Sequence, residues 1–368
     1  MTEPGTAELA PEVPAPASAR WPKLALQIAV SAAIVVGIFV FAIPRIADYS
    51  DVWATISGLT WLELWSLVAI TVLNLATYWF ANMAALPGLT IGKSAVLTQT
   101  TTSVANTLPA GGAVAVGLTY TILRSWGFHP QSIALYVGVT GVWNIFMKLA
   151  LPIFALSLLA LVGDATAALV AAALVGLAVL AAAVALFALA LWKKEFARRI
   201  GDGFGRVASA LRRLVRRPPI RDWGEHAVGF RKRTISLVLG RWPWLTLTTV
   251  VSHLMLWVVL LLALRHVGVS QEEVSTLETL AVFAFGRLLT ALPITPGGLG
   301  VIELGYIGGL VAAGGDEPQV VAAVLLFRVL TYAVPVPLGA GTYLVWRGRS
   351  SWRRPETAPA VAGPTAEG

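Results

Sequence analysis

The segment LETLAVFAFGRLLTALPITPGGLGVIELGYIGGLVAA, residues 277–313, decides the fold because it is apolar along its length and broken at its centre. Pro and paired Gly interrupt a helix there, and each half has about 15 residues, or about 22 Å of helix. That length is short of the roughly 30 Å hydrocarbon core of a bilayer. The segment SAVLTQTTTSVANTLPAGGAVAVGLTYTILRS, residues 94–125, follows the same pattern. Both segments predict a re-entrant helical hairpin, which enters and leaves the membrane from one side.

The composition of the whole chain is typical of a membrane protein. Of 368 residues, 57% are hydrophobic and 12% are charged, whereas soluble proteins have about 45–50% apolar and about 25% charged residues. Six further apolar runs are long enough to cross a bilayer: 24–43, 62–86, 132–162, 165–191, 244–264 and 319–345. We therefore expect an all-α polytopic membrane protein with about six transmembrane helices and two re-entrant hairpins.

The placement of Lys and Arg predicts the orientation, because cytoplasmic loops carry the excess of these residues. Basic residues precede the first run, concentrate in segment 192–243 and follow the last run. We expect this segment to be a cytoplasmic loop and both termini to be cytoplasmic. Residues 1–23 and 347–368 are Pro- and Ala-rich and are predicted to be disordered tails. The integral membrane domain then spans 24–346, and the Arg- and Ala-rich composition points to a bacterial cytoplasmic membrane.

Within segment 192–243, apolar residues recur at spacings of three and four between arginines, from Phe196 to Leu214. This spacing predicts a basic amphipathic helix that lies on an anionic leaflet. The alternative is an ordinary positively charged loop of modest helicity.

The two interrupted segments also suggest an internal repeat. With Gly111–Gly112 aligned on Gly297–Gly298, PAGGAVAVGLTY lies beside TPGGLGVIELGY, and each hairpin sits between two long apolar runs. The repeats would cover about 62–162 and 244–345, in opposite orientations. Inverted repeats with broken helices are typical of secondary transporters, which bind substrate near the midplane. Chance similarity between apolar segments rich in small residues is the alternative.

Ionisable residues inside apolar runs are costly and are therefore functional candidates. The candidates, with a neighbouring amide, are Asn144, Lys148, Arg287, Glu303 and Arg328. We expect the three basic side chains to line a polar cavity for an anionic head group, faced by the positive ends of the half-helices after Gly112 and Gly298. Glu303 would pair with a basic residue or carry a proton. Alternatively, its ion pair with Arg328 or Arg287 only fixes helix register, and His253 is expected to be a satisfied core residue.

Several chemistries lack the residues that they need. The chain has no Cys and only four His, and it contains no Walker loop, nucleophile elbow or zinc-protease motif. We expect no cofactor, no metal and no enzyme active site. The net charge of +8 is explained by the basic loops of a membrane protein, so no nucleic acid is expected as a partner.

The sequences PAGGAVAVGLTYTILRSWG and LPITPGGLGVIELGYIGGLVAAG resemble the lysylphosphatidylglycerol synthase transmembrane-region family, also called the flippase-like domain family. The resemblance covers most of residues 24–346. In bifunctional members, a related membrane domain moves aminoacylated phosphatidylglycerol across the cytoplasmic membrane, and a separate cytosolic domain attaches the amino acid. The chain ends soon after its last run, so the resemblance implies the translocator alone. The matching residues are Pro109, Gly111, Gly112 and Arg124, then Pro293, Pro296, Gly297, Gly298, Gly300 and Glu303, with Arg328 as a companion. Of these, Arg124 is expected to bind substrate together with Glu303 and Arg328.

Three functions remain open at this point. We expect a lipid translocator for a phospholipid or glycolipid head group, with membrane lipids, either anionic or aminoacylated phospholipid or glycolipid, as partners. The second is a membrane accessory protein that binds a lipid or polyprenyl-linked intermediate for a partner enzyme. The third, a membrane-embedded transferase, is disfavoured by the missing extramembrane carboxylate or metal site.

Overall fold

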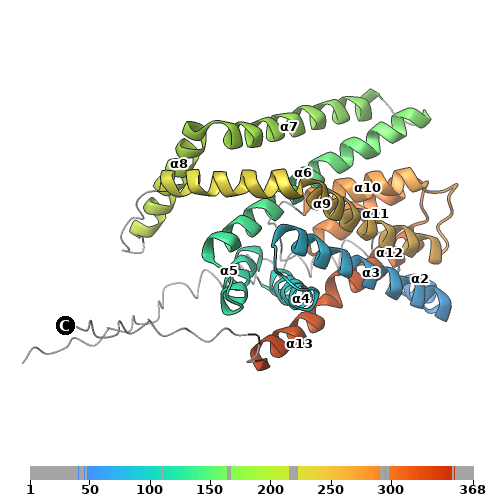
Figure 1. Cartoon of the computed structure of the whole chain (residues 1–368). Helices are drawn as coiled ribbons and strands as arrows, with labels where there is room; N and C mark the ends of the chain where they lie inside the picture. Colours follow the sequence, from blue (N-terminus) through green and yellow to red (C-terminus); the bar gives the residue numbers. More distant parts are fainter. Residues whose placement is uncertain are drawn as a thin grey trace, which may run out of the picture.

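The computed structural model describes residues 48–108, 111–163, 167–214, 223–290 and 298–349, with Val40, Arg45, Thr295 and Trp352 as isolated positions. All regular structure in these ranges is helical and none is strand, which confirms the all-α prediction (Figure 1). The predicted run 24–43 and the two predicted tails lie almost entirely outside the described residues.

Within the described residues, five helices are long and apolar enough to cross a membrane, and they match five of the six predicted runs. These are α3 (Trp61–Ala85), α6 (Pro130–Val162), α7 (Ala167–Trp192), α9 (Trp223–His266) and the continuous segment Glu317–Gly348. The start of α3 shows how sequence sets such an end. The Thr60 hydroxyl accepts from the Glu63 amide, and the Glu63 carboxylate accepts from the Thr60 amide, which is a capping box.

Both interrupted segments form two helices with a break between them, as predicted. The first hairpin consists of α4 (Ile91–Thr107) and α5 (Gly111–Ser125), and the second of α10 (Thr276–Leu289) and α11 (Val301–Ala312). The four arms are about 18–25 Å long at 1.5 Å per residue. After the second break, Gly298 and Gly300 have φ of 71° and 83°, in the region where Gly is preferred.

Not every predicted break residue lies in the described part of the chain. Pro109, Pro293, Pro296 and Gly297 are outside it. Gly112 lies beside Gly111 at the first turn of α5.

The two hairpins exchange partners between the two halves of the chain. In the first hairpin, α4 packs against α13 (Pro335–Gly348), which lies at the end of the second half. In the second hairpin, α10 packs against α6, which belongs to the first half. The first long helices of the halves, α3 and α9, pack against each other. These three contacts remain the same when the two halves are interchanged.

The last predicted run, 319–345, is not one uniform α-helix. It consists of α12 (Glu317–Arg328), a π-helical turn η4 (Val329–Ala333) and α13. Pro335 has no amide hydrogen and cannot donate the helical bond at this point. This irregular turn proves to be where the polar contacts gather.

The predicted loop 192–243 is largely helical in the described residues. It contains α8 (Lys194–Leu214), as the amphipathic pattern predicted, and the first half of α9, which continues through Pro243. A short helix, α2 (Tyr49–Ser57), packs against α12.

Candidate functional site

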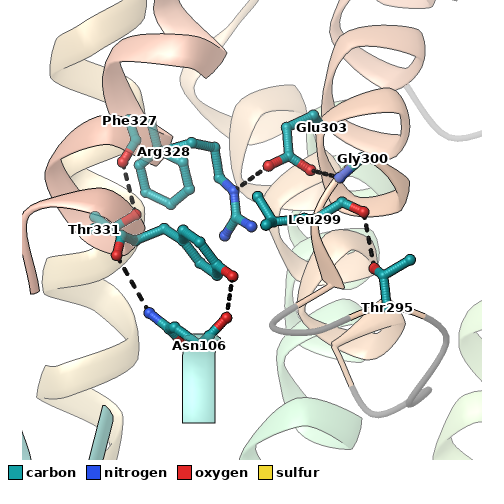
Figure 2. A network of polar contacts seen from close by, with 9 residues as sticks. Asn106, Thr295, Leu299, Gly300, Glu303, Phe327, Arg328 and Thr331 are labelled. Carbon is teal, nitrogen blue, oxygen red and sulfur yellow. Dashed lines mark hydrogen bonds and ion pairs between the residues drawn. The ribbon is translucent and has the colours of Figure 1, made fainter. Parts of the chain in front are cut away.

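A fully buried carboxylate, that of Glu303, lies at the break of the second hairpin (Figure 2). Glu303 is the third residue of α11, and one of its oxygens accepts a hydrogen bond of 2.7 Å from the amide of Gly300, the residue that caps this helix. The other oxygen accepts from Nε of Arg328 at 2.6 Å. Of the two basic partners that the sequence suggested for Glu303, the structure selects Arg328. At this helix end, where the sequence analysis expected an anionic head group, the amide of Gly300 is bound to the Glu303 carboxylate.

Arg328 connects the second hairpin to the π-helical turn. It is the last residue of α12, and its guanidinium lies over the ring of Tyr332, 4.5 Å from the ring centroid. The Tyr332 hydroxyl donates to the backbone carbonyl of Asn106, and the Asn106 amide nitrogen donates 3.3 Å to the carbonyl of Tyr332. Asn106 is the penultimate residue of α4. The breaks of the two hairpins are thus joined through one polar network, and π-helical turns are frequent at functional sites.

The contact between α4 and α13 holds this network in place. The Ser103 hydroxyl donates to the carbonyl of Val336 at 2.9 Å, and the hydroxyls of Thr100 and Thr342 are 3.0 Å apart. Gly339 allows the close approach, because a Cβ there would overlap the backbone carbonyl of Gln99. The polar face of α4 is therefore buried against the second half of the chain.

A second group of polar side chains, which we call the basic cluster, consists of Lys148, His253 and Arg287. They lie on α6, α9 and α10, three helices that pack against one another. Lys148 and Arg287 are like charges on neighbouring helices, and His253 lies on the third helix that packs against both. No carboxylate in the described residues pairs with any of the three.

The basic cluster has unused hydrogen-bonding capacity. His253 is 1% exposed; its Nδ1 contacts the Thr249 carbonyl at 3.0 Å, while its Nε2 has no partner. The buried Nε of Arg287 also has none. Among described residues, Lys148 makes neither a hydrogen bond nor an ion pair. His253 is therefore buried in the core as expected, but only one of its two ring nitrogens has a hydrogen-bond partner.

Tyr306 packs against α10, which carries Arg287, and against α12, which carries Arg328. Its ring stacks on Phe283 and meets Phe327 edge-on, at centroid distances of 6.3 and 5.7 Å. The aligned residue in the first hairpin, Tyr120, is instead exposed, so the two hairpins do not present the same surroundings at this position.

Two predicted site residues have other contacts. Asn144 is half-buried one turn before Lys148 on the same face of α6, and its amide donates to the Thr140 carbonyl at 3.1 Å. Arg124 is exposed near the end of α5, where it donates to the Phe128 carbonyl at 3.0 Å. About 20 Å of helix separates it from the break of its hairpin. The structure therefore does not bring Arg124 together with the other candidates.

The sequence analysis missed Asn106 and Tyr332, because their meeting depends on the packing of α4 against the other half of the chain. Trp79 and Trp257 also have buried indole nitrogens without a partner. In the described part of the chain, no three His, Asp or Glu side chains gather in a way that could hold a metal ion.

Comparison with known proteins identifies the family. No curated protein sequence matches the chain. The family described as the lysylphosphatidylglycerol synthase TM region matches residues 25–339. This range includes both hairpins, the ion pair and the basic cluster. The chain therefore belongs to the lysylphosphatidylglycerol synthase transmembrane-region family.

Proposed function

We propose that the protein translocates a lipid, moving the head group of a phospholipid or glycolipid past the hairpin breaks while the acyl chains stay in the bilayer. The basic cluster carries this proposal. Lys148 and Arg287 place positive charge inside an apolar bundle with no carboxylate of the described chain to neutralise it. Each such charge costs roughly 2.5–3.5 kcal/mol on insertion scales. An anionic group on a passing lipid would offset that cost.

The short hairpin arms support the same proposal. Helices of about 18–25 Å do not span a hydrocarbon core of roughly 30 Å. On the re-entrant topology, the first hairpin enters from the cytoplasm and the second from outside, as an inverted repeat. Both breaks then lie inside the membrane, next to the ion pair and the basic cluster, and irregular backbone at that depth is tolerated where it borders a polar path.

The Glu303–Arg328 pair would serve as the movable part of this path. Arg328 is 13% exposed whereas Glu303 is fully buried, so the guanidinium is the partner that can turn toward a ligand. A lipid phosphate could replace the carboxylate as its counter-charge. Tyr332, which lies beside the guanidinium, would then transmit the change to Asn106 in the first hairpin.

One observation favours the second candidate function, an accessory protein that binds a lipid-linked intermediate for a partner enzyme. Glu303 is buried, caps its own helix and is paired, which is also what a static structural pair requires. The two functions predict different results in a transport assay.

The test is translocation of head-group-labelled lipids in proteoliposomes, with anionic, aminoacylated, zwitterionic and glycosylated lipids compared. The variants are Lys148→Met and Arg287→Met, and the control is Lys232→Met, which removes an exposed lysine of α9. We expect wild type and the control to transport at least one lipid class, and both cluster variants to lose transport.

Protein stability separates loss of function from loss of fold. Because Lys148 and Arg287 have no ion-pair partner among the described residues, replacing either one takes no partner from another charge, and the unfolding midpoint should stay the same or rise. Transport at the wild-type rate in both cluster variants would refute the site. Binding of a lipid by wild type without transport of any class would refute translocation and support the accessory function.

A further inference from the structure

The basic helix α8 is not used by the proposed translocation path. It begins at Lys194, and the single residue Lys193 separates it from the end of α7 at Trp192. Figure 1 shows α7 along the outside of the bundle and α8 turning away from it. The most apolar stretch of α7 has no buried residue, so α7 has a lipid-facing surface that leads directly into α8.

One face of α8 already has a protein partner. Ala197, Gly201 and Gly205 recur at a spacing of four and are buried, and α8 packs against α9. Arg198 forms an ion pair with Glu225 in the first turn of α9. The small side chains thus let α8 lie close against the start of α9.

A second face of α8 is apolar and uncovered. Ile200 and Phe204 are 38% and 66% exposed. At about 100° per residue, they form a stripe about 80° around the helix from the buried small residues. No described segment covers this stripe. Full burial of a Phe or Ile side chain is favourable by about 1.5–3 kcal/mol. Transfer of the stripe from water into an apolar phase therefore lowers its free energy.

The remaining surface of α8 is strongly basic. Between Lys194 and Leu214 the sequence has six basic and two acidic residues. Arg199 and Arg206 are exposed and lie about 120–140° from the apolar stripe. Long arginine side chains can extend along a helix to bring their charged ends to the level of lipid phosphates.

We propose that α8 lies in the surface of an anionic lipid leaflet, with Ile200 and Phe204 among the acyl chains and the arginines at the head groups. Three observations select lipid over a protein partner. α8 follows the unburied α7 after a single residue, its charge is complementary to anionic lipid, and the face that packs against protein is a different one. Such helices bind through apolar burial together with attraction to anionic lipids. This proposal is independent of translocation.

The test uses the full chain in lipid nanodiscs. Since the chain has no Cys, a single fluorescent label can be attached at Phe204→Cys or Arg206→Cys, with Val184→Cys on the exposed side of α7 as the lipid-facing control. We expect a nitroxide lipid to quench the labels at 204 and 184 and not the label at 206. Aqueous iodide should do the reverse. Equal access of iodide to 204 and 206 would overturn the proposal, and so would protection of 204 from both quenchers, because protein would then cover it.

A charge variant tests the anionic part of the proposal. The change Arg199→Gln with Arg206→Gln, measured with the label at 204, should shift the equilibrium between inserted and exposed α8 by about fivefold per arginine in anionic nanodiscs. The shift should shrink in high salt and be small in zwitterionic nanodiscs. An unchanged equilibrium in anionic nanodiscs would show that the arginines do not contribute and would overturn the assignment to anionic lipid. The label at Val184 reports whether each variant is still inserted.

Discussion

Breaking the Glu303–Arg328 pair should destabilise the fold, and the size of the effect can be worked out from the contacts. Each oxygen of Glu303 accepts one hydrogen bond, from the Gly300 amide and from Arg328. Gln at this position offers one acceptor and one group that only donates. Whichever way it turns, one donor loses its acceptor and the Arg328 charge loses its counter-charge. Loss of one partner of a buried pair costs about 3–5 kcal/mol, and we expect Glu303→Gln to lose that much free energy of unfolding.

Replacing the other partner, in Arg328→Gln, should lower the free energy of unfolding by at least as much as Glu303→Gln. Arg328→Gln leaves a carboxylate that is fully buried, whereas Glu303→Gln leaves a guanidinium that is 13% exposed and lies over the ring of Tyr332. The double variant has no unpaired charge. Its loss should therefore be smaller than the sum of the single losses by about 2–3 kcal/mol, within the range of coupling energies for residues in contact.

The assay is reversible unfolding of the four proteins in the same lipid bicelles, so that one double-mutant cycle gives the coupling energy. A coupling below about 0.5 kcal/mol, the limit of ordinary additivity, would refute the reasoning. It would mean that the two side chains are solvated or partnered separately in the membrane.

Three further predictions concern the hairpin contacts. Gly339→Ala should lose about 1–3 kcal/mol of unfolding free energy, because the added Cβ overlaps a backbone carbonyl of α4, while Gly341→Ala has open space and should be neutral; equal effects would contradict the close approach. Gly111→Ala places its Cβ 2.5 Å from a backbone carbonyl of α4, whereas Gly112→Ala meets nothing within 4 Å, so only the first should lower the unfolding midpoint. Tyr332→Phe removes one hydrogen bond to the first hairpin and should cost about 0.5–1.5 kcal/mol; no change in bicelle unfolding would show that this bond adds nothing.

The sequence could predict the helices and their breaks because both depend on local properties. The run 62–86 is apolar over a sufficient length, and the Gly residues near positions 111 and 298 interrupt their segments wherever those segments pack. The π-helical turn Val329–Ala333 was not predicted, although Pro335 and Pro337 within the apolar run 319–345 were a signal for it. Hydropathy alone does not reveal such a turn.

The site could be predicted only in part, because its contacts join distant segments. Asn106 and Tyr332 are 226 positions apart, and nothing in either local sequence indicates their pairing. Glu303 and Arg328 are nearer and of opposite charge, so their pairing was among the alternatives. Arg124 matched a motif, but its side chain donates to the carbonyl of Phe128, in the connection that follows its own helix. His253 belongs to the basic cluster because α6 and α10, which carry Lys148 and Arg287, both pack against its own helix, α9.

The exchange of hairpins has a mechanical consequence. Since α4 packs against α13 and α10 packs against α6, each half of the chain contacts a hairpin arm of the other half. If the two halves separated as rigid bodies, the contacts of α4 with α13 and of α10 with α6 would both be broken. On the proposed translocation function, a conformational cycle would therefore slide or tilt an arm along the helix that it contacts. For the same reason, either half produced alone would expose one hairpin arm and one helix face that the other half normally covers. The two halves produced as separate chains should associate through these contacts.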